Sequence, residues 1–265
     1  MLKELQMIDA STLGLLGIHG AGAKALLQGQ LTCHMDEVNH TNFTFAALCN
    51  PKGRVICFGR IFLYQDSYYL QMPLETVPIA MKALQKYAVF FKATLSDDSQ
   101  KFSRVIYQNP TTTCNDGLIL PFNQTFHEYI GTTAISSTNS PALSWQNLDI
   151  LAKIPNIYPE TSEKFLPHEL NLHEINAIHF NKGCYTGQEI IARMQYRGKL
   201  KTKLYQGQTH QKPSRGDDVF DDTGKTAGMI VDFCQNNADH YDILFTSQNQ
   251  GPHFLNKEKT QEILL

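Results

Sequence analysis

The chain has 265 residues, of which 42% are hydrophobic and 18% are charged. This composition is typical of a soluble globular protein and argues against a disordered one, and the length predicts roughly two domains. The 23 basic and 25 acidic residues leave a net charge of −2. A net charge so close to zero does not indicate that the protein as a whole binds nucleic acid or membranes, so any basic binding site must be local.

Six cysteines are scattered along the chain without any C-x-x-C pair: Cys33, Cys49, Cys57, Cys114, Cys184 and Cys234. This spacing suits neither a zinc site nor a disulfide scaffold, and it favours free thiols in a reducing compartment. Glu4 and Asp9 interrupt the region where a signal peptide would have its apolar core. No run approaches the ~18 apolar residues of a membrane helix. We therefore expect a cytoplasmic protein without a bound metal.

The first part of the chain alternates strand patterns with helical ones. In chain order, the predicted elements are a strand over 13–18, a helix over 21–28, strands over 42–48, 54–64 and 68–72, a helical face at 77, 81, 84 and 88, and a strand near 91–95. Asn50–Gly53 is predicted to be a turn, with proline at its second position. This order suggests an α+β, ferredoxin-like unit.

The second part is less regular at first and then rich in strand signals. Residues 109–141 are rich in Thr, Ser and Asn, with a short strand over 117–122, and a helix is predicted over 145–151. After Arg197, strands over 199–205, 229–233 and 241–245 alternate with turns. We expect a small C-terminal β-barrel of about 70 residues.

Two motif-like patterns lack the context that would give them a function. Gly20–Ala25 fits G-x-G-x-x-A, but no second βαβ unit follows, so a tight turn is favoured over a dinucleotide site. His168 and His173 are five residues apart instead of the four of a zinc helix. On a helix they would be about 500° apart, so we expect the two rings to diverge.

A local basic run holds five cations in eleven residues without an acidic one: Arg193, Arg197, Lys199, Lys201 and Lys203. The three lysines alternate, so they would share one face of a strand. With the nearby tyrosines they could contact RNA phosphates and stack on bases. A solvated strand face explains the run equally well, and both interpretations stay open.

The segment from Lys182 to Glu189, KGCYTGQE, differs in kind. Thr186 and Glu189 have the spacing of a capping box, so Thr186 is predicted to cap a helix. Cys184 then lies two residues before the helix, where the helix dipole and the Lys182 cation favour a thiolate. A buried structural cysteine before an ordinary helix is the alternative.

At this segment the sequence resembles the YgfZ family, whose signature is K-G-C-Y-x-G-Q-E, and all seven fixed positions match. The resemblance extends over most of the chain and is weakest over 109–141. Further family-like stretches are LLQGQLT (26–32), KYAVFFKATLSDD (86–98), FLPHELNL (165–172) and ARMQYRGK (192–199).

The resemblance implies a fold like that of the T-protein of glycine cleavage, with two ferredoxin-like parts over residues 1–197 and the β-barrel over 198–265, around a folate channel. It implies binding of tetrahydrofolate or a derivative, and support of iron–sulfur client enzymes or assembly proteins, including those that modify tRNA. Trp145 falls at a folate-contacting tryptophan of the family, and a second such position is Leu13 here. We assign the chemistry to Cys184, Lys182 and Glu189, and folate contacts to Trp145, Tyr185, Gln188, Arg193 and Arg54.

Two alternatives remain at this point: a tetrahydrofolate-dependent aminomethyltransferase and an RNA-binding adaptor. T-proteins carry an acidic residue in the glycine-rich strand near folate and lack the signature cysteine. The corresponding stretch here, Asn50 to Tyr64, contains no carboxylate. Both departures argue against aminomethyl transfer, and whether the protein catalyses a reaction stays open.

Overall fold

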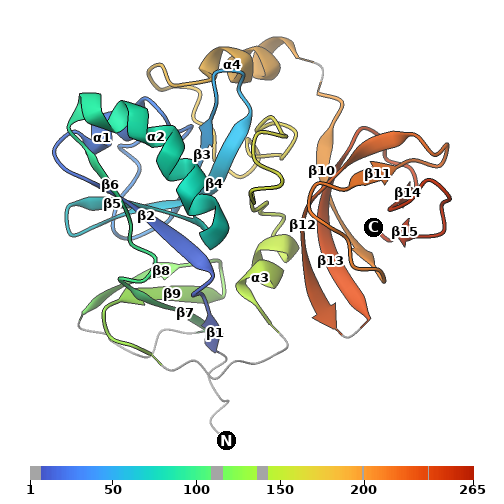
Figure 1. Ribbon diagram of the computed structural model, residues 1–265, viewed down its shortest axis with the longest axis horizontal. Helices are drawn as coiled ribbons and strands as arrows, with labels where there is room; N and C mark the ends of the chain where they lie inside the picture. The colour runs from blue at the N-terminus through green and yellow to red at the C-terminus, as the bar shows by residue number, and fades with distance from the viewer. Residues whose placement is uncertain (1–6, 109–115, 136–142, 199, 238) are drawn as a thin grey trace, which may run out of the picture.

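A computed structural model describes residues 7–108, 116–135, 143–198, 200–237 and 239–265 of the chain. This part contains three sheets, in which every strand pair is antiparallel, and a few helices packed on or between them (Figure 1). The predicted α+β class is confirmed. None of the described helices is both long and apolar enough to span a membrane.

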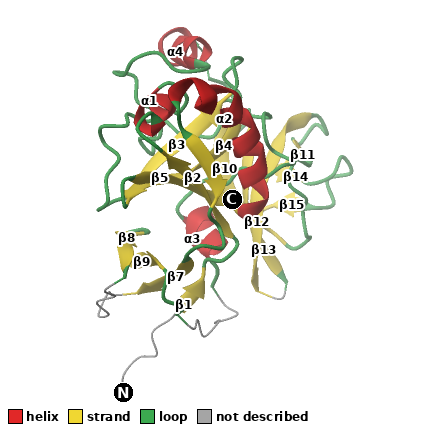
Figure 2. Cartoon of the chain, turned by 60° about the vertical axis from the view of Figure 1, so that its left-hand side comes forward, coloured by secondary structure: helices red, strands yellow, loops and turns green. Residues whose placement is uncertain are grey.

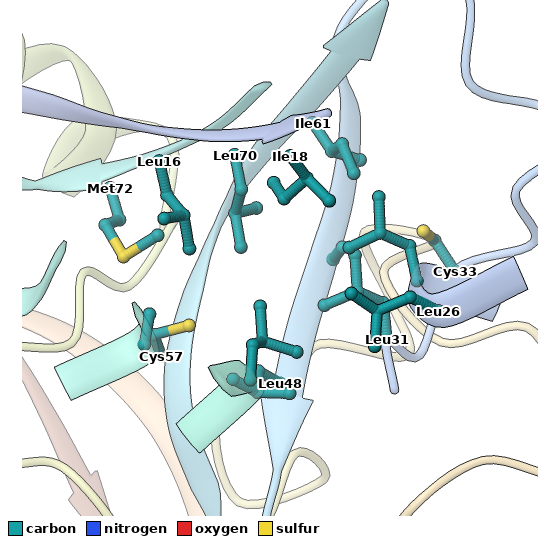
Figure 3. Packing of buried hydrophobic residues seen from close by; sticks show 14 of the residues in the cluster. Leu16, Ile18, Leu26, Leu31, Cys33, Leu48, Cys57, Ile61, Leu70 and Met72 are labelled. Carbon is teal, nitrogen blue, oxygen red and sulfur yellow. The ribbon is translucent and has the colours of Figure 1, made fainter. Parts of the chain in front are cut away.

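The first sheet has five strands in the order β3-β4-β5-β2-β6. Their bounds are β2 Leu13–His19, β3 Thr44–Cys49, β4 Val55–Tyr64, β5 Ser67–Pro73 and β6 Thr94–Asp97. Helices α1 (Ala23–Gln28) and α2 (Val77–Phe91) cover one face (Figure 2), and a short 3-10 turn, η1 (Leu74–Thr76), precedes α2. Apolar side chains from sheet and helices fill the space between them (Figure 3). The predicted strands agree with β2 to β5 within two residues at each end, whereas the strand expected near 91–95 begins three residues later, at Thr94.

The second sheet has four strands in the order β1-β7-β9-β8. They are β1 Met7–Asp9, β7 Ser103–Gln108, β8 Gly117–Pro121 and β9 Phe126–Gly131. The strand predicted over 117–122 is confirmed, whereas residues 109–115 and 136–141 of the irregular region lie outside the described residues.

Helix α3 (Trp145–Leu151) has the predicted bounds. It begins with a reciprocal cap, in which the Asn147 N–H donates to Ser144 Oγ (3.2 Å) and the Ser144 N–H donates to Asn147 Oδ1 (3.0 Å). The helix contacts β12 and β13 of the third sheet.

The third sheet has six strands in the order β10-β13-β12-β11-β14-β15. They are β10 Lys203–Thr209, β11 Asp218–Phe220, β12 Thr226–Asn237, β13 His240–Ser247, β14 His253–Phe254 and β15 Glu262–Ile263. Gln208 and Leu264 exchange two backbone hydrogen bonds (2.7 and 2.9 Å). These bonds join β10, at one edge of the sheet, to the residue that follows β15, at the other edge. The predicted barrel is confirmed as a nearly closed one; the domain boundary at residue 198 stays a prediction.

Two local predictions were wrong. The strand expected over 199–205 is observed only from Lys203, so Lys201 precedes the strand and does not share a strand face with Lys203. Lys199 lies outside the described residues. The rings of His168 and His173 do not diverge, since their centroids are 5.1 Å apart. The segment between them is a series of turns, with Asn171 at a φ of 53°, instead of a helix. Among the described residues, no cluster of His, Cys, Asp and Glu could hold a metal ion.

Candidate functional site

The signature segment, Lys182 to Glu189, leads into helix α4 (Gln188–Arg197) at the top of Figure 1. Its N-cap is Gly187, with a left-handed φ of 85°, and no side chain caps the helix. The Thr186 hydroxyl instead donates to Gln30 Oε1 (3.1 Å), and its N–H donates to the Gly29 carbonyl (3.1 Å). The predicted capping box was therefore wrong, because Thr186 bonds a distant segment and leaves the helix start to glycine.

Lys182 anchors the segment. Its side chain is buried, and Nζ donates to the carbonyl oxygens of Leu31 (2.6 Å) and Cys33 (2.7 Å) while lying 4.9 Å from the centre of the Tyr185 ring. Burial lowers the pKa of Lys182 to about 8. The ammonium of Lys182 is thus bonded to two backbone carbonyls, and its expected role as a counter-ion of Cys184 stays a prediction.

Cys184 is exposed, unlike the other described cysteines. Cys33, Cys49, Cys57 and Cys234 are buried, and burial raises the pKa of each of these four thiols. Cys114 lies outside the described residues. Among the described cysteines, Cys184 is thus the thiol that a solvent-borne reagent or partner can reach.

The segment is packed closely on the β3–β4 turn. Gly53 and Gly187 both have positive φ (72° and 85°), and a Cβ on Gly187 would lie 2.7 Å from the Asn50 carbonyl oxygen. Arg54 is held at this turn, since Nη1 donates to the Lys164 carbonyl (2.5 Å) and lies 3.5 Å from Glu169 Oε2. Two glycines are required here because their backbones meet without room for side chains.

Helix α4 presents part of the predicted basic run. Arg193 and Arg197 line a shallow surface depression of about 560 Å³ together with Glu189 and Tyr196, whose side chain is 71% exposed. Lys201 and Lys203 are exposed as well. Two cations and an accessible ring therefore share one surface with one carboxylate.

Trp145 lies in the protein interior. Its side chain is 1% exposed, and the indole N–H donates to Thr12 Oγ1 (2.7 Å). It belongs to the same buried cluster as Leu13 and Phe122. The structure thus places the two positions of the expected folate contact together, whereas Tyr185 belongs to a different apolar cluster.

Next to Trp145 lies a group of buried polar side chains, called here the interior polar cluster: Arg60, Gln71, Glu128 and Asp149. Arg60 forms a two-bond ion pair with Asp149, one turn after Trp145 on α3, with one Nη1–Oδ2 distance of 3.1 Å. Gln71 Nε2 donates to Glu128 Oε1 (2.7 Å). The Arg60 guanidinium lies 4.1 Å from the centre of the Phe122 ring.

The interior polar cluster retains hydrogen-bonding capacity. Within the described residues, nothing bonds to Arg60 Nε, Gln71 Oε1 or Glu128 Oε2. Burial raises the pKa of Glu128 to about 7, although Arg104 opposes the shift. Sequence reasoning missed this cluster; the available signal was a charged residue, Arg60, inside the apolar strand run VICFGRIFLY.

Comparison with known proteins identifies relatives of this chain. The chain is 31% identical over 225 residues to the tRNA-modifying protein YgfZ of Vibrio atlanticus, covering 77% of this chain and 69% of that protein. It is 30% identical over 244 residues to the protein of the same name from Photobacterium profundum, with 82% and 74% covered. The chain belongs to the YgfZ family.

Further comparisons agree with this placement. An uncharacterised Haemophilus influenzae protein is 32% identical over 219 residues, which cover 81% of this chain and 78% of that protein. A scan of protein-family models gave no match. The crystal structure of the glycine cleavage system aminomethyltransferase T from Bartonella henselae superimposes with a TM-score of 0.67 at 12% identity, covering 97% of this chain and 83% of that one. The T-protein fold expected from the sequence is confirmed.

Proposed function

We propose that this YgfZ-family chain is a folate-binding factor that supports iron–sulfur enzymes and, through them, tRNA modification, with Cys184 as its functional thiol. The observation that carries the proposal is the exposure of Cys184 on a segment that is otherwise anchored. Lys182 and Tyr185 on either side are buried, so the backbone is fixed while the thiol faces solvent. An accessible thiol held on a fixed segment can bind a soft metal or carry sulfur.

The test is rescue of a bacterium that lacks its own YgfZ protein, scored by the thiolated nucleosides of its tRNA. Cys184→Ser should abolish rescue, because a hydroxyl neither ionises near neutral pH nor binds soft metals. Cys57→Ala, at a buried thiol on β4, is the matched control and should rescue once the two protein levels are equal. Full rescue by Cys184→Ser would refute the thiol role.

The folate part of the proposal is supported by the surroundings of Trp145. A pterin ring presents neighbouring N–H donors, and the interior polar cluster offers unpartnered acceptors in Glu128 Oε2 and Gln71 Oε1. An aromatic stacking partner contributes about 1 kcal/mol beyond its buried area. Since Trp145 is covered, binding requires neighbouring side chains to move from its ring.

Calorimetry with tetrahydrofolate tests this part separately. We expect binding to the wild-type chain and a loss of about tenfold for Glu128→Leu, which removes the acceptors. Trp145 fluorescence should decrease on binding, because this is the only tryptophan of the chain. No heat at a protein concentration near 100 μM would contradict folate binding, because a dissociation constant of that size corresponds to about −5.5 kcal/mol. Aminomethyl transfer at about 1 s⁻¹ or faster would favour a T-protein activity instead.

The exposed face of α4 supports a contact with tRNA as part of the same proposal. Arg193 and Arg197 can pair with phosphates, and Tyr196 can stack on an unpaired base. A double change of both arginines to Glu should weaken binding of bulk tRNA in a filter assay and flatten its salt dependence. Unchanged binding would remove tRNA contact from the proposal without affecting the thiol test.

A further inference from the structure

The outer face of α2 borders a groove that takes no part in the proposed folate or thiol chemistry. The groove encloses about 670 Å³ between α2 and the tip of the β3–β4 hairpin. The wall that α2 provides is lined by Pro78, Ile79, Lys82, Ala83, Lys86 and Tyr87. The opposite wall is mainly Leu48, Cys49, Pro51 and Ile56, with Gln30, Asn50, Glu163 and Thr186 at its polar positions.

An apolar stripe runs along this groove and continues beyond it. Ile79, Ala83 and Tyr87 are only half-buried, and they recur at the four-residue spacing that places side chains on one helical face. Phe90, three residues later, falls on the same face and is 82% exposed. Phe90 follows Ile79 by eleven positions along the helix, so the stripe is about 16 Å long.

The charges beside the stripe are of one sign. Lys82 and Lys86 are exposed, and in the described part of the chain neither pairs with a carboxylate. Glu163, on the far wall, already accepts a hydrogen bond from Asn50 Nδ2 (2.8 Å). The groove therefore combines an apolar floor with a rim that is complementary to acidic groups.

We propose that this groove binds an acidic amphipathic helix of a partner protein, with its apolar side on the stripe and its carboxylates at Lys82 and Lys86. A helix of about three turns matches the 16 Å length, and helix-in-groove docking uses this kind of apolar anchor spacing. Phe90 lies beyond the groove lining, which suits an extended partner better than a small molecule that must be enclosed. The apolar floor between the two lysines suits the apolar face of a helix better than the phosphate backbone of a nucleic acid.

The location gives such a partner access to the signature segment. Thr186 is part of the groove wall and lies two residues from Cys184. A helix bound on α2 would therefore lie beside the segment that presents the exposed thiol, although the contact itself needs neither folate nor Cys184. Loss of the groove and loss of the thiol can consequently be distinguished.

The binding test uses the full chain and a fluorescein-labelled, 16-residue helical peptide with leucines on one face and glutamates on the other. Two reference peptides carry lysine in place of each glutamate, or the same composition in scrambled order. Fluorescence anisotropy should show saturable binding of the acidic peptide below about 100 μM. The basic and scrambled peptides should bind at least about tenfold more weakly.

Variants of the chain locate the contact. Phe90→Ser should weaken binding of the acidic peptide about tenfold, whereas Leu151→Ser, at an exposed apolar residue of α3, should not. Lys82→Glu/Lys86→Glu should reverse the preference towards the basic peptide, and Lys201→Glu/Lys203→Glu should leave it unchanged. Circular dichroism checks that each variant is folded.

Several outcomes would overturn the proposal. The first is no saturable binding up to about 1 mM, and the second is equal binding of the scrambled peptide. A chain dimer that dissociates on Phe90→Ser in sedimentation velocity would assign the groove to a second copy. Competition by a single-stranded oligonucleotide, lost in Lys82→Glu/Lys86→Glu, would assign it to RNA.

Discussion

The signature segment and the interior polar cluster place their reactive groups in opposite ways. In the signature segment, the buried Lys182 and Tyr185 hold the backbone while Cys184 faces solvent. In the interior polar cluster, every charged group is buried, and Arg60 and Asp149 neutralise each other. We therefore expect a change at Cys184 to remove the proposed function without lowering stability, whereas a change in the interior polar cluster first alters stability.

The largest expected effect comes from breaking the Arg60–Asp149 pair. Asp149→Leu should lower the free energy of unfolding by about 3–5 kcal/mol, because it leaves a buried guanidinium without its counter-charge. Urea denaturation measures this loss. The double variant Arg60→Met/Asp149→Leu removes both charges and should recover much of the stability. A loss below about 1 kcal/mol for the single variant would mean that water reaches the pair.

The next effect is a pH dependence that belongs to Glu128. Burial raises its pKa from an ordinary 4.5 to about 7, so the folded state binds this proton more tightly than the unfolded chain does. The stability that the protonated Glu128 contributes is fully present below pH 4.5 and is lost as the pH rises through 7. This loss lowers the free energy of unfolding by up to about 3 kcal/mol. Glu128→Gln should therefore gain stability relative to wild type across this window.

Thermal unfolding at pH values from 4.5 to 8 measures that relative gain. Glu258→Gln, at an exposed carboxyl group, is the control and should follow the wild type at every pH. Parallel curves for Glu128→Gln and wild type would show that the buried carboxyl does not titrate in this range.

The two signature glycines provide a third, smaller contrast. Gly187→Ala should cost about 2 kcal/mol, since φ is 85° and the new Cβ would lie 2.7 Å from the Asn50 oxygen. A Cβ on Gly183 meets nothing within 4 Å, so Gly183→Ala should change stability by less than about 0.5 kcal/mol. Equal unfolding free energies for the two variants would contradict the close packing on the β3–β4 turn.

The smallest stability effect is expected at the residue to which we assign the function. Cys184→Ser should change the unfolding free energy by less than about 0.5 kcal/mol, as expected for an exposed side chain. Cys57→Ser should cost about 1–3 kcal/mol, because it buries a hydroxyl group. In the wild type, Cys184 should be alkylated by iodoacetamide on the order of 100-fold faster than Cys57, whose reaction requires local opening. Similar alkylation rates would remove the contrast between the two thiols.

Much of the fold could be predicted because it depends on local patterns. Apolar and β-rich runs separated by turns marked β2 to β5, and the helical face from Val77 to Ala88 marked α2. The candidate site was predicted only in part. Thr186 has the sequence of a cap, but its hydroxyl bonds Gln30, which lies 156 positions away. No short-range pattern can reveal such a partner.

The sequence by itself determined the strands and helices of the first sheet, the bounds of α3 and the family whose signature KGCYTGQE matches. The tertiary structure decided which groups of that segment face inward: Lys182 bonds Leu31 across 151 positions, and Cys184 stays outside. It also decided that Arg60 and Asp149, 89 positions apart, neutralise each other. Secondary structure follows from neighbours within about four residues, whereas burial and ion pairing follow from contacts that exist only once the sheets have packed.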